Sequence, residues 1–526
     1  MILALVMFVL LGISVLFNLG HLLSGLVPMR VTHSSASGPR LEEVLKEDNM
    51  LLNEQQRQIG KDNFSDALRL TRREMLSGLA AIPSVTAFYW GYDRLKGDPV
   101  RAALIGAGDQ GRAHIGSVNP DYIRFAAFSD IRPSNQKKAR VAFEAKYGVE
   151  ARRIELVEDY HKLLNRDDIE MVIIALPLHL HAAASIEALE KGKHVLSEKL
   201  MAKTVGECKR MVRVARKRGR MLAIGHQRHY SYLYANALEV IRQKDILGDV
   251  RHIRAFWHRN QTGGGKPGAD KGEFDGWHRS IPEEDKKVDF AKYGYKSLEE
   301  LVRWRLYART GGGLMVELGS HQLDACGIFL SEVLGHEDPK APREPVHPLA
   351  VSGVGATSYF TDGREVEDHI FLTYEFPQNT VVTYSSICTN EFDQYGELVL
   401  GTKGTLAVLS EKDVYLFKEK APKDTRITWA EKRIGEAVAT STSTAQWVVD
   451  VGIPDTLSSR GYREEQEHLA WLIRNPGQGQ PRCSGEVALG DAVVTLASNV
   501  AMRDKRRIEF KKEWFDVGSD AGPENG

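Results

Sequence analysis

The sequence is poor in cysteine and has no surplus of either charge. Its four cysteines, Cys208, Cys326, Cys388 and Cys483, lie far apart among 526 residues, with no CxxC pair or Cys/His cluster. This spacing argues against a zinc site or a disulfide framework, so we expect reduced, buried thiols. Lysine plus arginine and aspartate plus glutamate each total 70, so the net charge predicts no nucleic-acid partner.

Charged side chains are also missing from residues 1–29, MILALVMFVLLGISVLFNLGHLLSGLVPM. A helix of this length is long enough to cross a hydrocarbon layer of about 30 Å. A cleaved signal peptide normally begins with basic residues, and none is present here. We therefore expect a transmembrane anchor, followed by a polar linker over residues 30–70.

Residues 71–97 contain a second apolar run. Arg72 and Arg73 precede an uncharged stretch from Met75 to Tyr92, and the pattern resembles the bacterial twin-arginine export signal, which carries folded proteins. The alternative is a helix start with two solvated arginines and a buried segment after it. The basic residues between the two apolar runs place the linker in the cytoplasm and everything after Tyr92 outside. We expect a membrane-anchored protein with an extracytoplasmic (periplasmic) globular part.

Residues 100–111, VRAALIGAGDQG, have the pattern of a buried strand entering a glycine-rich turn. Gly106 allows the tight turn, Gly108 lets the backbone approach a pyrophosphate, and Gly111 permits close helix packing. The next strand, IRFAAFSD, ends at Asp130, where an acid would hold the ribose hydroxyls of a dinucleotide. Arg132 would suit a 2′-phosphate, so the pattern allows either NAD or NADP.

Further strands alternate with helices up to residue 228. This alternation predicts a doubly wound parallel sheet, a Rossmann domain, over residues 98–228. Ligands bind at the carboxyl edge of such a sheet. The residues expected at that edge are Pro177, His181, Glu198, Lys199 and Gln227. His179 and His226 lie near the same edge, but the histidine spacing follows loop ends, so we predict no metal site.

After Gly248 the strands become longer and alternate in hydropathy, as in a half-exposed antiparallel sheet. We expect an α+β domain over residues 229–515 and a disordered tail over residues 516–526. Within this domain, Trp304 and Arg305 suit the wall of a sugar pocket, because an aromatic face and a fork of donors match a sugar. A core position for Trp304 is an equal alternative.

The segment LMVELGSHQLDACGIFL predicts a helix that carries acid–base groups. Glu317, His321 and Asp324 lie at i, i+4 and i+7, so they share a face. His321 is the natural base, and Glu317 or Asp324 would orient it or bind substrate. Lys199 would stabilise a developing alkoxide. The alternative is a solvated helical face with a helix-supporting charge pattern.

These motifs resemble those of the Gfo/Idh/MocA oxidoreductases. The resemblance spans about residues 99–510 and is carried by GAGDQG (106–111, including Asp109 and Gln110), LPLHLHA, VLSEKLMA and GGGLMVELGSHQLD (311–324). It implies cofactor contacts at the first motif and a second domain with a large open, mainly antiparallel sheet, whose outer face often forms dimers. Two positions depart from the family pattern: Leu200 replaces the proline of EKP, and Glu317 replaces an aspartate.

We therefore expect an NAD(P)-dependent oxidoreductase that transfers a hydride between the nicotinamide and a hydroxyl of a sugar, glycoside or polyol. One alternative is a redox-neutral, NAD-dependent glycosidase that works by oxidation, elimination and hydration. Another is a sugar-binding sensor that uses the fold without turnover.

Overall fold

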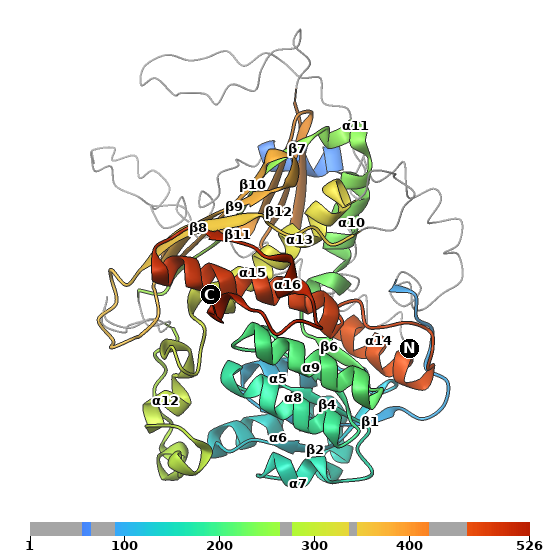
Figure 1. The fold of residues 1–526 in the computed structure, drawn as a ribbon. Coiled ribbons are helices and arrows are strands. Elements are labelled where there is room, and N and C mark those ends of the chain that lie inside the picture. The colour runs from blue at the N-terminus through green and yellow to red at the C-terminus, as the bar shows by residue number, and fades with distance from the viewer. Residues whose placement is uncertain (1–54, 65–89, 263–275, 336–343, 420–459, 526) are drawn as a thin grey trace, which may run out of the picture. The chain divides into compact units, whose positions relative to one another are not determined.

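A computed structural model describes residues 55–64, 90–262, 276–335, 344–419 and 460–525 (Figure 1). The expected anchor at residues 1–29 and most of the twin-arginine-like segment at residues 71–97 lie outside these ranges. Within them, no helix combines the length and the apolar character needed to cross a bilayer.

The first half of the described chain forms a six-stranded parallel sheet in the order β3-β2-β1-β4-β5-β6. Its central strands are mainly apolar and buried; all four residues of β4 are buried, for example. Such runs form only where helices cover both faces, so the predicted doubly wound domain is confirmed. The strands are β1 (Val100–Ile105), β2 (Ile123–Ser129), β3 (Glu155–Leu156), β4 (Met171–Ile174), β5 (His194–Ser197) and β6 (Leu222–Ile224). The helices between them are α5 (Asp109–Ser117), α6 (Pro133–Tyr147), α7 (Tyr160–Leu164), α8 (His181–Glu190) and α9 (Val205–Arg218).

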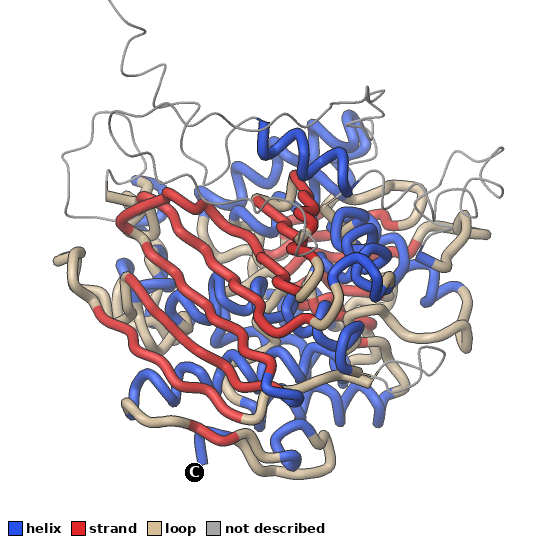
Figure 2. The backbone as a smooth tube through the Cα atoms, turned by 90° about the horizontal axis from the view of Figure 1, so that it is seen from above, coloured by secondary structure: helices blue, strands red, loops and turns tan. Residues whose placement is uncertain are grey.

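The second sheet has eight strands in the order β13-β12-β11-β7-β10-β9-β8-β14, and Figure 2 shows its strands side by side. Its long strands alternate buried and exposed residues, as β9 does, so one face packs against helices and the other is open. The strands are β7 (Val250–Asn260), β8 (Ala350–Ala356), β9 (His369–Phe376), β10 (Thr380–Ile387), β11 (Thr389–Gly401), β12 (Gly404–Leu409), β13 (Asp413–Lys418) and β14 (Ile508–Glu509). All pairs are antiparallel except β7 with β10, so the sheet is mixed but mainly antiparallel, as expected.

Helices cover the inner face of this sheet. α13 (Ser320–Leu334) packs on β7 and β11, and α15 (Gly485–Asp504) packs on β8 (Figure 1). α10 (Tyr232–Arg242) packs in turn against α13. The other α-helices that follow α10 are α11 (Lys244–Leu247), α12 (Leu298–Val302), α14 (Tyr462–Arg474) and α16 (Lys512–Phe515).

α14, within the expected second domain, packs against the Rossmann sheet. Leu469 and Ala470 are buried in the same apolar cluster as Val100 and Leu104 of β1. One helix of residues 229–515 therefore packs against the Rossmann sheet. Sequence periodicity could not show this, because an amphipathic helix does not specify which sheet its apolar face covers.

The folded unit also begins before residue 98. Trp90 and Tyr92 are 5% and 3% exposed and belong to the same apolar cluster as β1. The hydroxyl of Tyr92 donates to Glu467 Oε2 at 2.7 Å, which ties this entry segment to α14. The last apolar residues of the expected export segment are therefore part of the globular core.

Residues 55–64 of the expected linker form a helix against the edge strand β13. Asn63 Nδ2 donates to the carbonyl of Leu416 at 2.8 Å, and Lys61 pairs with Asp413 at 3.1 Å. This helix and the second sheet must lie on the same side of any membrane. The contact conflicts with our expectation of a cytoplasmic linker and an outside domain.

The expected disordered tail at residues 516–526 is instead packed through residue 524. Lys209 of α9 is fully buried, and its Nζ donates to the carbonyls of Glu513 and Ala521 at 2.8 and 2.7 Å. Glu524 Oε1 accepts the N–H of Val205 in the first turn of α9 at 2.8 Å. A buried ammonium requires such acceptors, and the tail supplies them. The four cysteines are free and buried, as expected.

Candidate active site

A cavity of about 1,210 Å³ runs from the glycine turn after β1 to the helix α13. Most of the residues expected at the site line it together. They are Gly106, Gly108, Asp109, Gln110, Asp130, Arg132, Pro177, His181, Glu198, Lys199, Trp304, Arg305, Glu317 and His321. The expected residues Gly111, Gln227 and Asp324 do not line it. Gly111 packs under the turn, and Gln227 and Asp324 are buried beside the cavity.

The glycine turn has the geometry that a dinucleotide needs. Gly106 has φ +90°, and a Cβ there would lie 2.4 Å from the carbonyl oxygen of Ala175. A Cβ at Gly111 would lie 2.1 Å from the Gly106 carbonyl oxygen. Among the described residues no side chain caps α5, whose N-cap is Gly108, so the first N–H groups of the helix are available to a pyrophosphate.

Asp130 lies at the end of β2, as predicted, and also holds the glycine turn. Its carboxylate accepts the N–H groups of Ala107 and Arg132, each at 2.8 Å. The side chain is 8% exposed and lines the cavity. The residue is therefore placed where an acid binds ribose hydroxyls in this fold.

Glu198 is held by a chain of hydrogen bonds that begins in α14. Gln466 Nε2 donates to His114 Nδ1 at 3.1 Å, which leaves His114 Nε2 as the donor to Glu198 Oε1 at 2.7 Å. Gln110 Nε2 donates to the same oxygen at 2.7 Å. The side chain of Gln110 is thus committed to Glu198. Sequence reasoning missed His114 and Gln466, which have no motif of their own.

His181 ties two strand-end loops together. Its Nδ1 lies 2.8 Å from the carbonyl oxygen of Leu200, and its Nε2 lies 2.7 Å from that of Leu176. Pro177 directly precedes the short helix η2 (Leu178–Leu180) on this loop. The peptide bond between Lys199 and Leu200 is cis.

Lys199 reaches from the end of β5 to the segment before α13. Its Nζ donates to the carbonyl of Glu317 at 2.8 Å and to that of Val316 at 3.3 Å. Burial lowers the pKa of Lys199, and the nearby carboxylate of Glu317 opposes that shift. Because the lysine crosses the cavity, it joins the Rossmann domain to the helix that bears His321.

Glu317 lies in a π-helical turn, η7 (Met315–Gly319), directly before α13. Its Oε2 accepts from Arg305 Nε at 2.7 Å. Burial raises the pKa of Glu317, but Arg305 and Lys199 lower it more, so the net shift is downward. Glu317 is therefore an ionised partner of Arg305. π-Turns are frequent at functional sites.

His321 is a buried, neutral imidazole at the cavity wall. Burial and the positive charges of Lys199 and Arg228 hold its pKa well below the usual range. Its Nδ1 is buried and has no hydrogen-bond partner among the described residues. The expectation that Glu317 or Asp324 orients this ring is wrong, because the π-turn alters the helical spacing, and Asp324 Oδ1 accepts from His229 Nε2 at 2.9 Å.

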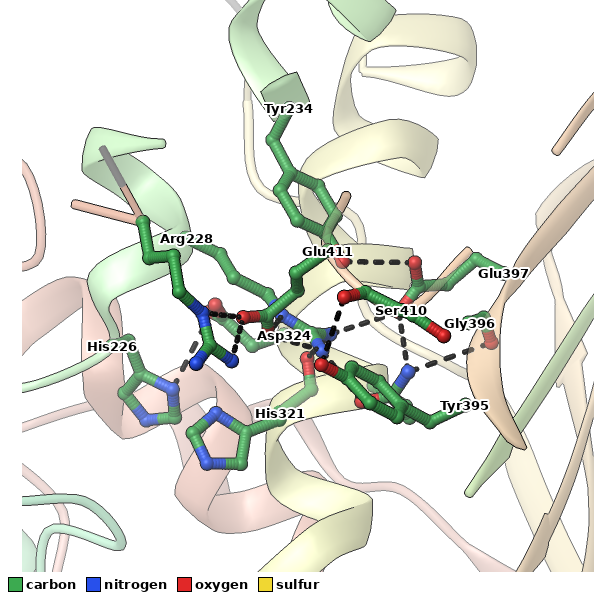
Figure 3. A network of polar contacts seen from close by, with 12 residues as sticks. His226, Arg228, Tyr234, His321, Asp324, Tyr395, Gly396, Glu397, Ser410 and Glu411 are labelled. Carbon is green, nitrogen blue, oxygen red and sulfur yellow. Dashed lines mark hydrogen bonds and ion pairs between the residues drawn. The ribbon is translucent and has the colours of Figure 1, made fainter. Parts of the chain in front are cut away.

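Arg228 holds the backbone of His321 from behind the cavity (Figure 3). Its Nη1 donates to the His321 carbonyl at 2.6 Å and to Glu397 Oε1 at 2.8 Å. Its other donors reach Gln322 Oε1 at 2.8 Å and Glu411 Oε1 at 2.9 Å. Sequence reasoning missed this residue; its position directly after Gln227 at the sheet edge was the available signal.

His179 and His226 have separate surroundings. The ring of His179 lies against Tyr295, whereas His226 is fully buried, with its Nε2 3.3 Å from Asp491 Oδ2. In the part of the chain that the structure describes, no three His, Cys, Asp or Glu side chains are arranged to hold a metal ion.

Comparison with protein families identifies both halves. Residues 100–226 match the family described as "Oxidoreductase family, NAD-binding Rossmann fold", and residues 286–510 match its "C-terminal alpha/beta domain". The chain belongs to the Gfo/Idh/MocA oxidoreductase family. The family's Rossmann domain is NAD-binding, and the glycine turn, the free start of α5 and Asp130 fit a nicotinamide dinucleotide.

Curated relatives of this Gfo/Idh/MocA protein carry names that describe three different activities. It is 31% identical to inositol 2-dehydrogenase of Salmonella paratyphi B over 150 residues, 28% of this chain and 43% of the relative. It is 30% identical to a glycosyl hydrolase family 109 protein of Shewanella pealeana over 194 residues, 36% and 42% of the two chains. It is 28% identical to a dTDP-3,4-didehydro-2,6-dideoxy-alpha-D-glucose 3-reductase of Actinomadura kijaniata over 239 residues, 43% and 58%. The chain thus spans about half the length of these relatives.

Solved structures share the fold of this Gfo/Idh/MocA protein. The WlbA dehydrogenase of "Chromobactrium violaceum", in complex with NADH and UDP-GlcNAcA, superposes with a TM-score of 0.54 at 19% identity, over 80% of this chain and 98% of that one. Levoglucosan dehydrogenase with NADH and L-sorbose gives 0.53 at 16% identity, over 79% and 100%. At these identities the likeness establishes the fold.

Proposed function

We propose that this protein oxidises or reduces a hydroxyl-bearing carbon of a sugar, glycoside or polyol with NAD. The observation that carries this proposal is the convergence of Lys199 and His321 on one cavity with the dinucleotide turn at Gly106. The names of the curated relatives, among them an inositol dehydrogenase and a sugar reductase, support the same substrate class.

In this mechanism the bound nicotinamide supplies the hydride acceptor or donor. His321 accepts the hydroxyl proton, which requires the neutral imidazole that its lowered pKa provides. The Lys199 ammonium donates a hydrogen bond to the oxygen as negative charge develops. The carbonyls of Val316 and Glu317 hold that ammonium at the cavity wall.

Trp304 and Arg305 form the proposed sugar-binding wall. The guanidinium of Arg305 lies 4.2 Å from the centre of the Trp304 ring, and Glu317 fixes its orientation. The pair offers an aromatic face beside charged donors, which suits the C–H face and the hydroxyls of a sugar. Asp324, which was also expected to bind the substrate, is not part of this wall, because its carboxylate accepts a hydrogen bond from His229.

The direct test is turnover with a panel of polyols, free sugars and glycosides, followed by NADH absorbance and by mass spectrometry of the products. We expect NAD-dependent oxidation of at least one member. Mass spectrometry of small molecules released from denatured protein identifies the cofactor and any trapped substrate. If the protein neither binds a dinucleotide nor turns over any member of the panel, the proposal is refuted.

A redox-neutral glycosidase is the second candidate, favoured by the 30% identity to a glycosyl hydrolase family 109 protein. The same base and lysine would serve it, because oxidising one carbon acidifies the neighbouring C–H bond. Release of free sugar from an aryl glycoside, without net NADH, would select this reaction. Release of sugar together with stoichiometric NADH would reject it, and so would the absence of any sugar release.

We also propose that residues 1–29 anchor the protein and that its globular part is extracytoplasmic, as the uncharged leader and the twin arginines suggest. The contact of Asn63 with Leu416 requires residues 55–64 to lie on the same side as the domain. A reporter inserted after Phe64 in the full chain and a reporter fused after Gly526 test this. We expect both reporters to show the same activity, and to show it only outside the cytoplasm.

Two results would contradict this topology. Activity of the Gly526 fusion inside the cytoplasm, unchanged when Arg72 and Arg73 are both replaced by lysine, would reject export. If the two reporters were found on opposite sides of the membrane, residues 55–64 and the globular domain could not lie on the same side.

We further propose that two copies pair through the open face of the second sheet. Val354 and Phe371 lie opposite each other on β8 and β9 and are 64% and 45% exposed. Adjacent exposed apolar side chains on an open sheet face are suited to contact with a second copy. Phe371→Asp should convert a dimer to a monomer in analytical ultracentrifugation, whereas a monomeric wild type would refute the proposal.

A further inference from the structure

Asp285 connects the segment between β7 and β8 to the start of α6. It lies in the short helix η4 (Glu283–Lys287) and is fully buried. Its Oδ2 is 2.9 Å from Arg132 Nε and also 2.9 Å from Arg132 Nη2. Its Oδ1 accepts the N–H of Ser134 at 2.9 Å, and its Oδ2 accepts the Ser134 hydroxyl at 2.6 Å. One carboxylate thus receives the donors of two residues that follow β2.

These donors stand where a dinucleotide-binding fold recognises the adenosine ribose. The acid at the end of β2 holds the ribose hydroxyls, and an arginine beside it accommodates the 2′-phosphate of NADP. Here Asp130 is that acid, and its carboxylate accepts the N–H of Arg132 at 2.8 Å. A guanidinium, a hydroxyl and a helical N–H together form an anion site. In this protein the anion is already present, as Asp285.

α6 provides a further indication that Asp285 replaces a phosphate. The helix starts with Pro133, which has no N–H, so the N–H of Ser134 is the first available donor. No side chain of the helix itself caps this end. Arg132 lines the dinucleotide cavity, and Asp285 pairs with its guanidinium.

We propose that Asp285 is a built-in substitute for the 2′-phosphate and makes the protein select NAD over NADP. The inference rests on the proposed function only in assuming that a dinucleotide binds along the cavity. A 2′-phosphate carries up to about two negative charges and would meet a buried carboxylate, while its natural partner Arg132 is already paired. The 2′-hydroxyl of NAD carries no charge and can still donate a hydrogen bond to Asp130.

Cofactor binding, measured without any substrate, tests this proposal. The purified full chain is titrated with NADH and with NADPH, and the fluorescence of the bound nicotinamide gives two dissociation constants. Wild-type protein should bind NADH at least about tenfold more tightly than NADPH. Asp285→Asn keeps the shape of the side chain and removes its charge, so it should reduce this preference about tenfold or more.

Further variants make the result specific. Glu284→Gln removes the same charge at the exposed neighbouring position and should leave the NADH/NADPH ratio unchanged. Arg132→Ala in the Asp285→Asn background should abolish the gained NADPH affinity, because it removes the group that Asp285 had occupied. Asp285→Ser should reduce the preference for NADH over NADPH in the same way, since the serine hydroxyl is uncharged but can still accept a hydrogen bond from Arg132.

The contrary results are distinct. An equal loss of affinity for both dinucleotides in folded Asp285→Asn would make Asp285 a structural bridge only and would overturn the proposal. Equal affinities of the wild type for NADH and NADPH would overturn it before any variant is made. If the wild type binds neither dinucleotide, the proposed function itself fails, and this outcome is visible in the first titration.

Discussion

Replacing Arg228 tests whether the network behind the cavity positions His321. The side chain is 2% exposed and serves four acceptors, two of them the carboxylates of Glu397 and Glu411 (Figure 3). Arg228→Met would leave Glu411 paired with Arg460, whereas Glu397 would keep only the hydrogen bonds from Tyr234 and Gln322 among the described residues. Removing one partner of a buried ion pair typically costs about 3 to 5 kcal/mol. We expect a loss of this size in the free energy of unfolding.

The loss should depend on pH in a definite direction. Burial raises the pKa of Glu397 to about 7, and Arg228 opposes this shift. Without Arg228 the folded-state pKa rises further above the unfolded value of about 4.3. The folded variant then binds more protons than the unfolded chain, so its stability falls as pH rises through this interval. The destabilisation should be larger at pH 8 than at pH 5.5.

Urea unfolding of wild type and variant, followed by circular dichroism at both pH values, gives the measurement. Glu397→Gln in the Arg228→Met background should recover part of the stability at pH 8, because it removes one uncompensated charge. Arg228→Lys retains the charge but cannot reach all four acceptors, so single-turnover hydride transfer should fall about tenfold as His321 loses its backbone restraint. Unchanged unfolding of Arg228→Met at both pH values would refute the reasoning.

Three other predictions concern catalysis, acid stability and the C-terminus. Lys199→Ala and His321→Ala should each slow single-turnover hydride transfer about 10²- to 10⁴-fold while NADH binding persists, and wild-type rates in both would remove them from the mechanism. Burial lowers the pKa of fully buried His226 to about 4, below its unfolded value of about 6.5. Its neutral form therefore contributes stability above pH 6.5, about 3 kcal/mol, which is lost as pH falls towards 4, and His226→Gln should flatten this part of the stability profile. Glu524→Ala removes the carboxylate that accepts the Val205 N–H at the start of α9 and should lower the melting temperature, whereas an unchanged value would show that the tail does not stabilise that helix.

The alternation of strands with helices and the position of the glycine turn follow from the sequence alone. Buried strands such as β4 are continuous apolar runs, and the conformation at Gly106 is one that only glycine adopts easily. The residues at strand ends could be assigned to one edge because parallel strands share a direction. Lys199 and His321 were therefore predicted at one cavity from local patterns, and the structure places both there.

The partners of these residues were decided only by tertiary structure. Arg228 meets His321, Gln466 meets His114, and Asp285 meets Arg132 across long sequence separations that no local period encodes. The π-turn at Met315–Gly319 also broke the simple helical spacing on which the role of Glu317 rested, and Asp324 pairs with His229 instead. A polar side chain that is buried on folding must find a partner wherever the packed chain supplies one, and that partner is set by the fold rather than by the neighbouring residues.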